Sequence, residues 1–181
     1  MRRPARARAA SGPTVEILLK STRWKAQPRA AAIIRKAIAA AAKAASTPPA
    51  ELAIVLTNDS SIRALNRDWR GLDAPTNVLS FPAGASKAGP RVPGNRTIGN
   101  RVLNRTLGDI VIAYQTMARE ARDEDKPFAH HLAHLAVHGY LHLLGYDHDN
   151  DRDAHKMERL EAKILKRLGV PDPYAGHPPV R

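Results

Sequence analysis

The chain has 181 residues and a mass of 19.8 kDa, which is the size of one domain with tails rather than of two domains. It contains no cysteine, so disulfides, iron–sulfur clusters and a cysteine nucleophile are excluded, and any metal must be held by His, Asp or Glu. The formal net charge of +12 is typical of proteins that bind polyanions, and nucleic acid is the first candidate partner.

The N-terminal half is predicted to alternate strands with helices after a basic arm. Residues 1–13 carry several arginines and no apolar run, which predicts a disordered arm; an Arg-rich organelle presequence is the alternative. Hydrophobic periodicity predicts strands at 15–19, 51–56 and 78–81 and helices at 29–45 and 58–69. Arginine and lysine interrupt the Ala-rich helix, so it is predicted to be soluble rather than membrane-spanning.

The C-terminal half begins after a predicted insertion at 83–106, a long mobile loop that has basic residues and no acidic ones. Periodicity then predicts a strand at 107–112, helices at 114–122, 127–144 and 151–168, and a Pro-rich tail at 176–181. Strands and helices in the order β-α-β-α-β-β-α-α-α predict an α+β fold, in which a small mixed four-stranded sheet packs with about five helices.

A histidine motif in the helix at 127–144 and the following turn predicts a metal site. His138 and His142 are four residues apart, so both imidazoles lie on one helix face and can bind one ion. Gly145 can adopt the left-handed conformation that ends the helix, which lets the chain reverse and bring His148 to the same ion. Three imidazoles leave one position open on a tetrahedral ion, as in catalytic rather than structural zinc sites. We therefore expect one Zn²⁺ per chain.

Other histidines precede this motif. His134 continues the row, but it is eight residues from His142, about 12 Å along a helix, so one ion cannot bind both. We interpret His130, His131 and His134 as a polar cluster that either faces nucleic acid or consists of ordinary helix histidines.

The residue after His138 bears on the reaction class. Zinc proteases with this ligand spacing place their general base, a glutamate, directly after the first histidine. This chain has Gly139 there, which disfavours a peptidase. Cleavage of a phosphodiester needs less from a carboxylate, because a metal and a cation can stabilise the developing charge.

Three further residues are candidates for the site. Asp109 and Asp147 could each hold an imidazole in one tautomer; alternatively, Asp147 caps the turn after Gly145, and Asp109 is a strand or turn residue. Arg70 could clamp a phosphate. It precedes Gly71, so it could instead complement the C-terminus of its helix.

Several segments together resemble the YbeY family of bacterial metal-dependent endoribonucleases and rRNA maturation factors. The matching residues are Leu65 and Asn66 with Trp69 and Arg70, the run at 73–82, Leu107 to Ile110, the histidine motif at 138–148, and parts of 157–174. The resemblance implies a small mixed sheet with helices, zinc on His138, His142 and His148, and Arg70 as the catalytic basic residue.

The resemblance also implies a substrate and partners. These are single-stranded RNA, including the 3′ end of the small-subunit (16S) rRNA, with roles in ribosome quality control and contacts with the small ribosomal subunit and its assembly proteins. Two features depart from the family's pattern. Asn77 stands where the family often has aspartate, so a carboxylate role is lost there. The insertion at 83–106 is longer and more basic than usual, and we favour RNA contacts over a merely solvated loop.

The sequence therefore predicts a single metallo-endoribonuclease domain at 14–175, cytoplasmic and without a membrane anchor. One alternative is a non-catalytic ribosome-assembly factor in which a structural metal links the C-terminal helices. A zinc peptidase is the less favoured third hypothesis.

Overall fold

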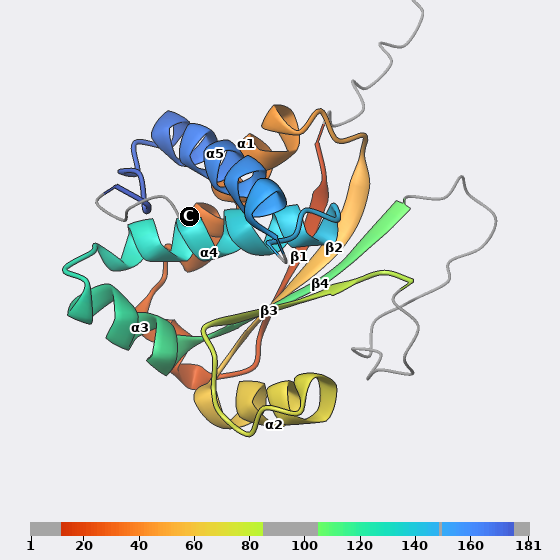
Figure 1. The fold of residues 1–181 in the computed structure, drawn as a ribbon. Helices are drawn as coiled ribbons and strands as arrows, with labels where there is room; N and C mark the ends of the chain where they lie inside the picture. Colours follow the sequence, from red (N-terminus) through yellow and green to blue (C-terminus); the bar gives the residue numbers. More distant parts are fainter. Residues whose placement is uncertain (1–11, 85–104, 149, 176–181) are drawn as a thin grey trace, which may run out of the picture.

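The computed structural model describes residues 12–84, 105–148 and 150–175 (Figure 1). Four strands form one sheet in the order β1-β2-β4-β3. The strands are β1 (Thr14–Leu19), β2 (Ala50–Thr57), β3 (Val78–Pro82) and β4 (Arg105–Ala113). β1, β2 and β4 are parallel, whereas β3 runs antiparallel to β4 at the edge. The predicted α+β fold with a mixed four-stranded sheet is confirmed.

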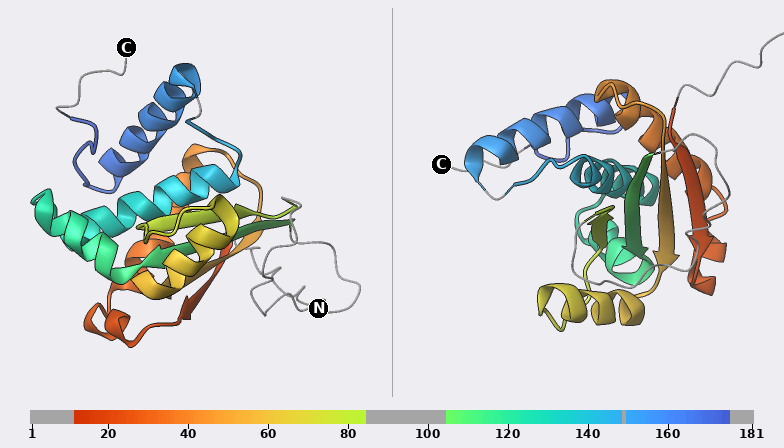
Figure 2. Two further views of the ribbon diagram at one scale, coloured as in Figure 1. Left: turned by 60° about the horizontal axis from the view of Figure 1, so that its bottom comes forward. Right: turned by 90° about the vertical axis from the view of Figure 1, so that its right-hand side faces the viewer.

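Helices cover both faces of the sheet. They are the 3-10 helix η1 (Thr22–Ala26) and the α-helices α1 (Ala30–Ala44), α2 (Asp59–Arg70), α3 (Tyr114–Asp123), α4 (Phe128–Leu143) and α5 (Asp151–Arg167). Figure 1 shows α2 on one side of the sheet, with α1, α4 and α5 on the other. In Figure 2, α5 lies over α4 on the side away from the sheet. In the described part of the chain, no helix is long and apolar enough to cross a membrane.

The alternation of side chains along β4 explains this division. Ile110 and Ile112 belong to the large core that includes residues of α1, α4 and α5. Val111 and Ala113 point to the opposite face and join the smaller core under α2. Successive residues of a strand face opposite sides of the sheet, so an apolar run in β4 needs helices on both sides.

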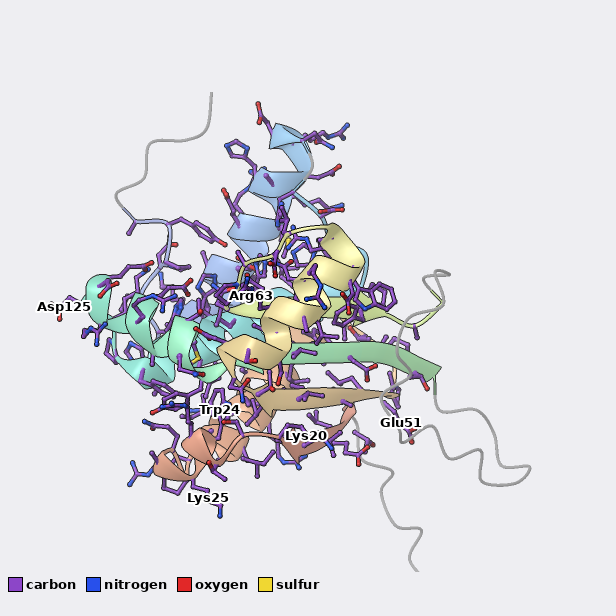
Figure 3. All side chains as sticks on the ribbon, turned by 90° about the horizontal axis from the view of Figure 1, so that it is seen from below. Lys20, Trp24, Lys25, Glu51, Arg63 and Asp125 are labelled. Atoms are coloured by element: carbon purple, nitrogen blue, oxygen red, sulfur yellow. The ribbon has the colours of Figure 1, made fainter. Side chains whose placement is uncertain are left out.

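Trp24 anchors η1 beside the end of the sheet. Its ring is buried, and its Nε1 donates a hydrogen bond of 2.8 Å to the carbonyl oxygen of Thr57, at the end of β2. The ring meets Tyr114 edge-on, with ring centroids 5.3 Å apart, and Phe128 at 6.1 Å. Figure 3 shows Trp24 near Lys20 and Lys25 at this end of the molecule. The aromatic cluster joins η1 to the first residues of α3 and α4.

Gly139 allows α4 to lie very close to the sheet. A Cβ atom at this position would be 2.9 Å from Cγ2 of Ile110 and 3.0 Å from Oγ of Ser80. The Ser80 hydroxyl also donates a hydrogen bond of 3.2 Å to the carbonyl oxygen of Gly139. These contacts with β3 and β4 set the rotation of α4 about its axis, and therefore the direction in which its histidines point.

The predicted insertion is shorter than expected at its C-terminal end, because β4 begins at Arg105. At the N-terminal end of the insertion, the backbone N–H of Ala83 donates to the carbonyl oxygen of Leu107, which continues the β3–β4 pairing. Residues 85–104 of the predicted loop, 1–11 of the predicted arm and the tail at 176–181 lie outside the described residues.

Candidate metal centre

The turn after α4 brings the third histidine back to the helix. Gly145 has φ +86°, the left-handed conformation that glycine adopts without steric cost. The backbone N–H of Tyr146 donates to the carbonyl oxygen of Leu141 at 3.1 Å, and that of Gly145 to His142 at 3.0 Å. These bonds end the helix as a glycine C-cap does, and the chain then reverses toward His148.

His138, His142 and His148 meet at one point, as their spacing predicted. Each offers a ring nitrogen, and the three nitrogens lie within 4.8 Å of one another. Nε2 of His142 is 3.1 Å from Nε2 of His138. The ring of His148 has its centroid 5.0 Å from that of His142 and 5.8 Å from that of His138. Two half-buried imidazoles and one exposed imidazole therefore surround one position at the surface.

This geometry fits a metal ion. Two nitrogens bound to a tetrahedral ion at the bond lengths typical of zinc lie about 3.3 Å apart, close to the 3.1 Å between His138 and His142. Burial lowers the pKa of His142, and the nearby His138 and His148 lower it further. A lowered pKa keeps the imidazole neutral, which is the form that binds a metal. In the described part of the chain, no fourth His, Asp or Glu joins the three histidines.

Glu161 of α5 orients His138 and was not predicted from the sequence. Nδ1 of His138 donates a hydrogen bond of 2.8 Å to Oε1 of Glu161, which leaves Nε2 as the nitrogen that faces His142. The Tyr174 hydroxyl donates to Oε2 of Glu161, and Nε2 of His134 is 3.6 Å from the same oxygen. The carboxylate is fully buried. A carboxylate behind a metal-binding histidine commonly fixes its tautomer in this way.

The charge on Glu161 depends on these neighbours. Burial raises the pKa of its carboxyl group, but the interactions with His134 and His138 outweigh burial and lower the pKa to about 2. A sequence signal for this role existed. Glu161 follows Met157 by four residues and precedes Leu165 by four, so an acidic residue interrupts the buried face of α5. A buried carboxylate must find partners, and here they are histidines.

The two predicted aspartates lie in different places. Oδ1 of Asp147 accepts a hydrogen bond of 2.8 Å from the backbone N–H of His148, so it holds the turn that carries the third histidine. Its charge also raises the pKa of His142 against the larger effect of burial. Asp109 alternates with Ile110 on β4 and so lies on the face covered by α2. The structure does not bring Asp109 to the histidines, which lie on the other side of the sheet.

Arg70 is the last residue of α2, and its side chain is exposed. Gly71 ends the helix with φ +72°, and the Gly71 backbone N–H donates to the carbonyl oxygen of Arg67 at 3.0 Å. Within the part of the chain that the structure describes, the guanidinium of Arg70 makes no hydrogen bond to the helix end and no ion pair. It is therefore available to an external anion.

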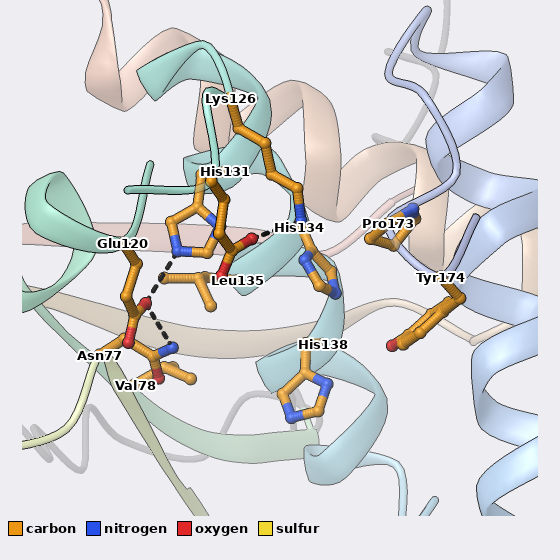
Figure 4. A pocket seen from close by; sticks show the side chains of 11 residues that line it. Asn77, Val78, Glu120, Lys126, His131, His134, Leu135, His138, Pro173 and Tyr174 are labelled. Carbon is orange, nitrogen blue, oxygen red and sulfur yellow. Dashed lines mark hydrogen bonds and ion pairs between the residues drawn. The ribbon is translucent and has the colours of Figure 1, made fainter. Parts of the chain in front are cut away.

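Two of the three upstream histidines line a cleft beside the three metal-ligand candidates. His131 and His134 are on the same side of α4 as His138, and all three contribute to a cleft of about 390 Å³ (Figure 4). Nε2 of His131 is 2.9 Å from Oε2 of Glu120 on α3. The structure thus places His131 and His134 in polar contacts next to the candidate metal centre. That they face nucleic acid stays a prediction.

Comparison with known proteins assigns the family. A family model described as "Endoribonuclease YbeY" matches residues 17–169. The chain belongs to the YbeY family. Relatives with the same name include those of Bradyrhizobium sp. strain BTAi1, 54% identical over 90% of this chain and 93% of the relative, and of Nitrobacter winogradskyi, 55% identical over 93% of this chain and 85% of the relative. The resemblance read from the sequence is thus confirmed.

The fold also has a counterpart among solved structures. A Thermotoga maritima protein, determined in solution, matches with a TM-score of 0.52. The two share 22% sequence identity, and the match covers 93% of this chain and all of the other. At this identity the likeness concerns the YbeY fold alone.

Proposed function

We propose that the chain is a zinc-dependent endoribonuclease that cuts single-stranded RNA. The observation that carries this proposal is the meeting of three imidazole nitrogens within 4.8 Å, without a fourth protein ligand among the described residues. Membership of the YbeY family, whose relatives are named endoribonucleases, supports the reaction class. The net charge of +12 supports a polyanionic substrate.

The side chains around the three histidines would prepare them for a metal. Zinc held by three imidazoles supplies a Lewis acid and makes water more acidic near neutral pH. Glu161 holds His138 in the tautomer whose Nε2 faces His142. The bend at Gly145 and the bond from Asp147 hold the segment that carries His148. The chain thus presents its ligands in fixed positions, which lowers the entropy lost on binding.

Arg70 would bind the phosphate backbone of the RNA. Its guanidinium is exposed at the end of α2, and it has no ion-pair partner among the described side chains. Guanidinium groups bind phosphate oxygens through paired hydrogen bonds, and a positive charge stabilises the charge that develops in phosphodiester cleavage. We assign Arg70 this catalytic role from the resemblance to the YbeY family rather than from its position, since α2 and α4 lie on opposite sides of the sheet.

The structure argues against both alternatives. For a peptidase, the residue after His138 would have to be a base that reaches the metal, but Gly139 is packed against Ile110 and Ser80 of the sheet. Any side chain there would face the core. For an assembly factor with a structural metal, four protein ligands are usual, whereas three histidines converge in the described residues.

The family also suggests a cellular role. We extend the proposal to maturation of the 3′ end of 16S rRNA and to ribosome quality control, in the cytoplasm. The partners would be the small ribosomal subunit and its assembly proteins. This part rests on the resemblance to the family and on the charge of the chain.

The decisive experiment combines metal analysis with cleavage of a defined single-stranded RNA. We expect His142→Ala to lose both zinc and cleavage, and Arg70→Glu to keep zinc but lose RNA binding. His155→Ala, on α5 outside the three-histidine group, is the control and should change neither. A metal-free His142→Ala protein that still cleaves the RNA at the wild-type rate would refute the proposal.

A further inference from the structure

The cleft beside His138 has no part in the proposed chemistry, yet it adjoins the candidate metal centre. Its walls come from segments far apart in the sequence: the start of β3 with the residue before it, α3 with the loop after it, one side of α4 and the C-terminal segment. Figure 4 shows Glu120 and Asn77 on one side, Tyr174 on the other and His134 between them. At about 390 Å³, the cleft has the size of a small-molecule site. A nucleotide next to one held at the metal would reach it.

One wall is held by a chain of hydrogen bonds. Oε2 of Glu120 accepts from Nδ2 of Asn77 at 2.8 Å and is 2.9 Å from Nε2 of His131. Burial raises the pKa of Glu120, but these two bonds and the charge of Arg119 outweigh it, so the pKa is lowered. The carboxylate is therefore ionised at neutral pH and fixed in position.

The charges of the cleft select against phosphate. Glu120 and Glu124 contribute carboxylates, while Lys126, the lysine among the lining residues, is already paired with Glu124. Glu124 and Lys126 therefore offset each other, which leaves the carboxylate of Glu120 to repel a phosphate group. A carboxylate accepts hydrogen bonds from donor groups, and the N–H donors of a nucleotide belong to its base.

Two further features suit a base. Nδ1 of His131 is buried without a hydrogen-bond partner in the described part of the chain, and a buried polar atom without a partner usually meets a ligand or water. Tyr174 forms the opposite wall, held by the bond from its hydroxyl to Glu161. Single-stranded RNA is commonly recognised by aromatic side chains on which bases stack.

We infer that this cleft binds the nucleobase of a nucleotide next to the cleaved phosphate, and that Glu120 recognises an exocyclic amino group on that base. The inference rests on the proposed function, since it places the cut beside His138. Adenine, cytosine and guanine carry such an amino group, whereas uracil has carbonyl oxygens, which a carboxylate repels, and only the ring N3–H as a donor. The site would therefore give the nuclease a preference against uracil at one position that flanks the cut.

The first test measures kcat/KM for a single-stranded RNA with one cut site, in which each flanking position is A, C, G or U in turn. At one position the wild type should prefer an amino-bearing base over uracil by roughly tenfold, the size expected for a hydrogen bond to a charged group. Glu120→Gln should reduce this preference to about threefold or less. Asp123→Asn, an exposed carboxylate on the same helix, should keep it.

The zinc content and thermal unfolding of both variants should match the wild type, which separates loss of recognition from loss of the site. Equal rates for all bases in the wild type, or an unchanged preference in Glu120→Gln, would overturn the inference. A wild type that does not cleave RNA when loaded with zinc would instead overturn the proposed function.

A second test needs neither cleavage nor a variant. NMR titration of the intact wild type with adenosine 5′-monophosphate should shift the ring signals of His131 and His134, whereas ribose 5-phosphate, which has no base, should not. Equal shifts with both compounds would show recognition of phosphate or ribose and would contradict a base site. No shift with either would contradict it as well.

Discussion

At the scale of single residues, Glu161 connects two helices through one hydrogen bond. It is 23 positions from His138 in the sequence, yet the two side chains lie 2.8 Å apart. The carboxylate is fully buried and also accepts the hydroxyl of Tyr174. Its negative charge favours the tautomer of His138 that binds a metal through Nε2, and it strengthens that nitrogen as a ligand.

Glu161→Gln tests this role. The amide keeps the shape of the side chain but removes the charge, so we expect zinc affinity to fall by about 10- to 100-fold. Competition with a chromophoric chelator measures the affinity. Glu158→Gln, one turn earlier on the same helix and not among the candidate metal ligands, should leave it unchanged. Equal affinity in wild type and Glu161→Gln would mean that the contact has no influence on the metal.

Gly139→Ala tests how closely α4 approaches the sheet. Alanine normally stabilises a helix interior relative to glycine, by about 1 kcal/mol. Here the added Cβ would lie 2.9 Å from Cγ2 of Ile110, so we expect a net loss of about 1–3 kcal/mol in the free energy of unfolding, measured by urea denaturation. Gly12→Ala, where nothing lies within 4 Å of the new atom, is the control. A stabilised Gly139→Ala protein would show that β3 and β4 can move to accommodate the added Cβ atom.

At the scale of elements, the candidate metal centre depends on how α4, its terminal turn and α5 are joined. α4 supplies two histidines, and the turn after Gly145 supplies the third. α5 follows almost at once and returns across α4, which places Glu161 behind His138. Asn150 begins α5: its side-chain oxygen accepts from the backbone N–H of Asp153 at 3.0 Å. The N-cap therefore defines the end of the segment that carries His148.

Asn150→Ala should act on both stability and metal binding. Loss of an N-cap costs about 1 kcal/mol, and a loosened start of α5 should also weaken zinc binding, because His148 lies just before it. Asn58→Ala is the matched control: Asn58 caps α2 through Ser61, on the other side of the sheet. It should lower the unfolding temperature by a similar amount without changing zinc affinity. Equal zinc affinities in the two variants would show that the N-cap of α5 has no influence on zinc binding.

At the scale of the whole molecule, charge and shape serve different purposes. The excess of basic residues, 29 against 17 acidic ones, attracts RNA from any direction. Two acidic residues have a local role instead: Glu161 is bonded to His138 of the candidate metal centre, and Glu120 to His131 in the cleft. Affinity for the backbone and recognition at the cut would thus come from separate sets of residues.

The affinity for RNA should therefore depend strongly on salt. Binding that neutralises about five phosphates of a single strand should weaken roughly 100-fold between 50 and 200 mM salt, measured by fluorescence anisotropy with a cleavage-deficient His142→Ala protein. Arg70→Ala in the same background should reduce the slope of log affinity against log salt by about 0.7, the share of one phosphate contact. An affinity that does not change with salt would contradict a charge-driven encounter.

Local sequence determined the elements and the three metal-ligand candidates. Strands and helices follow from the period of apolar residues, and His138, His142 and His148 are brought together by one helix turn and one glycine bend, interactions that span only 11 residues of sequence. Tertiary structure decided the rest. Glu161 reaches His138, and Glu120 reaches Asn77 and His131, only because helices pack across a sheet whose strands are not in sequence order. Asp109 is next to Ile110 in the sequence but faces the opposite side of the sheet, because neighbouring residues of a strand point to opposite sides.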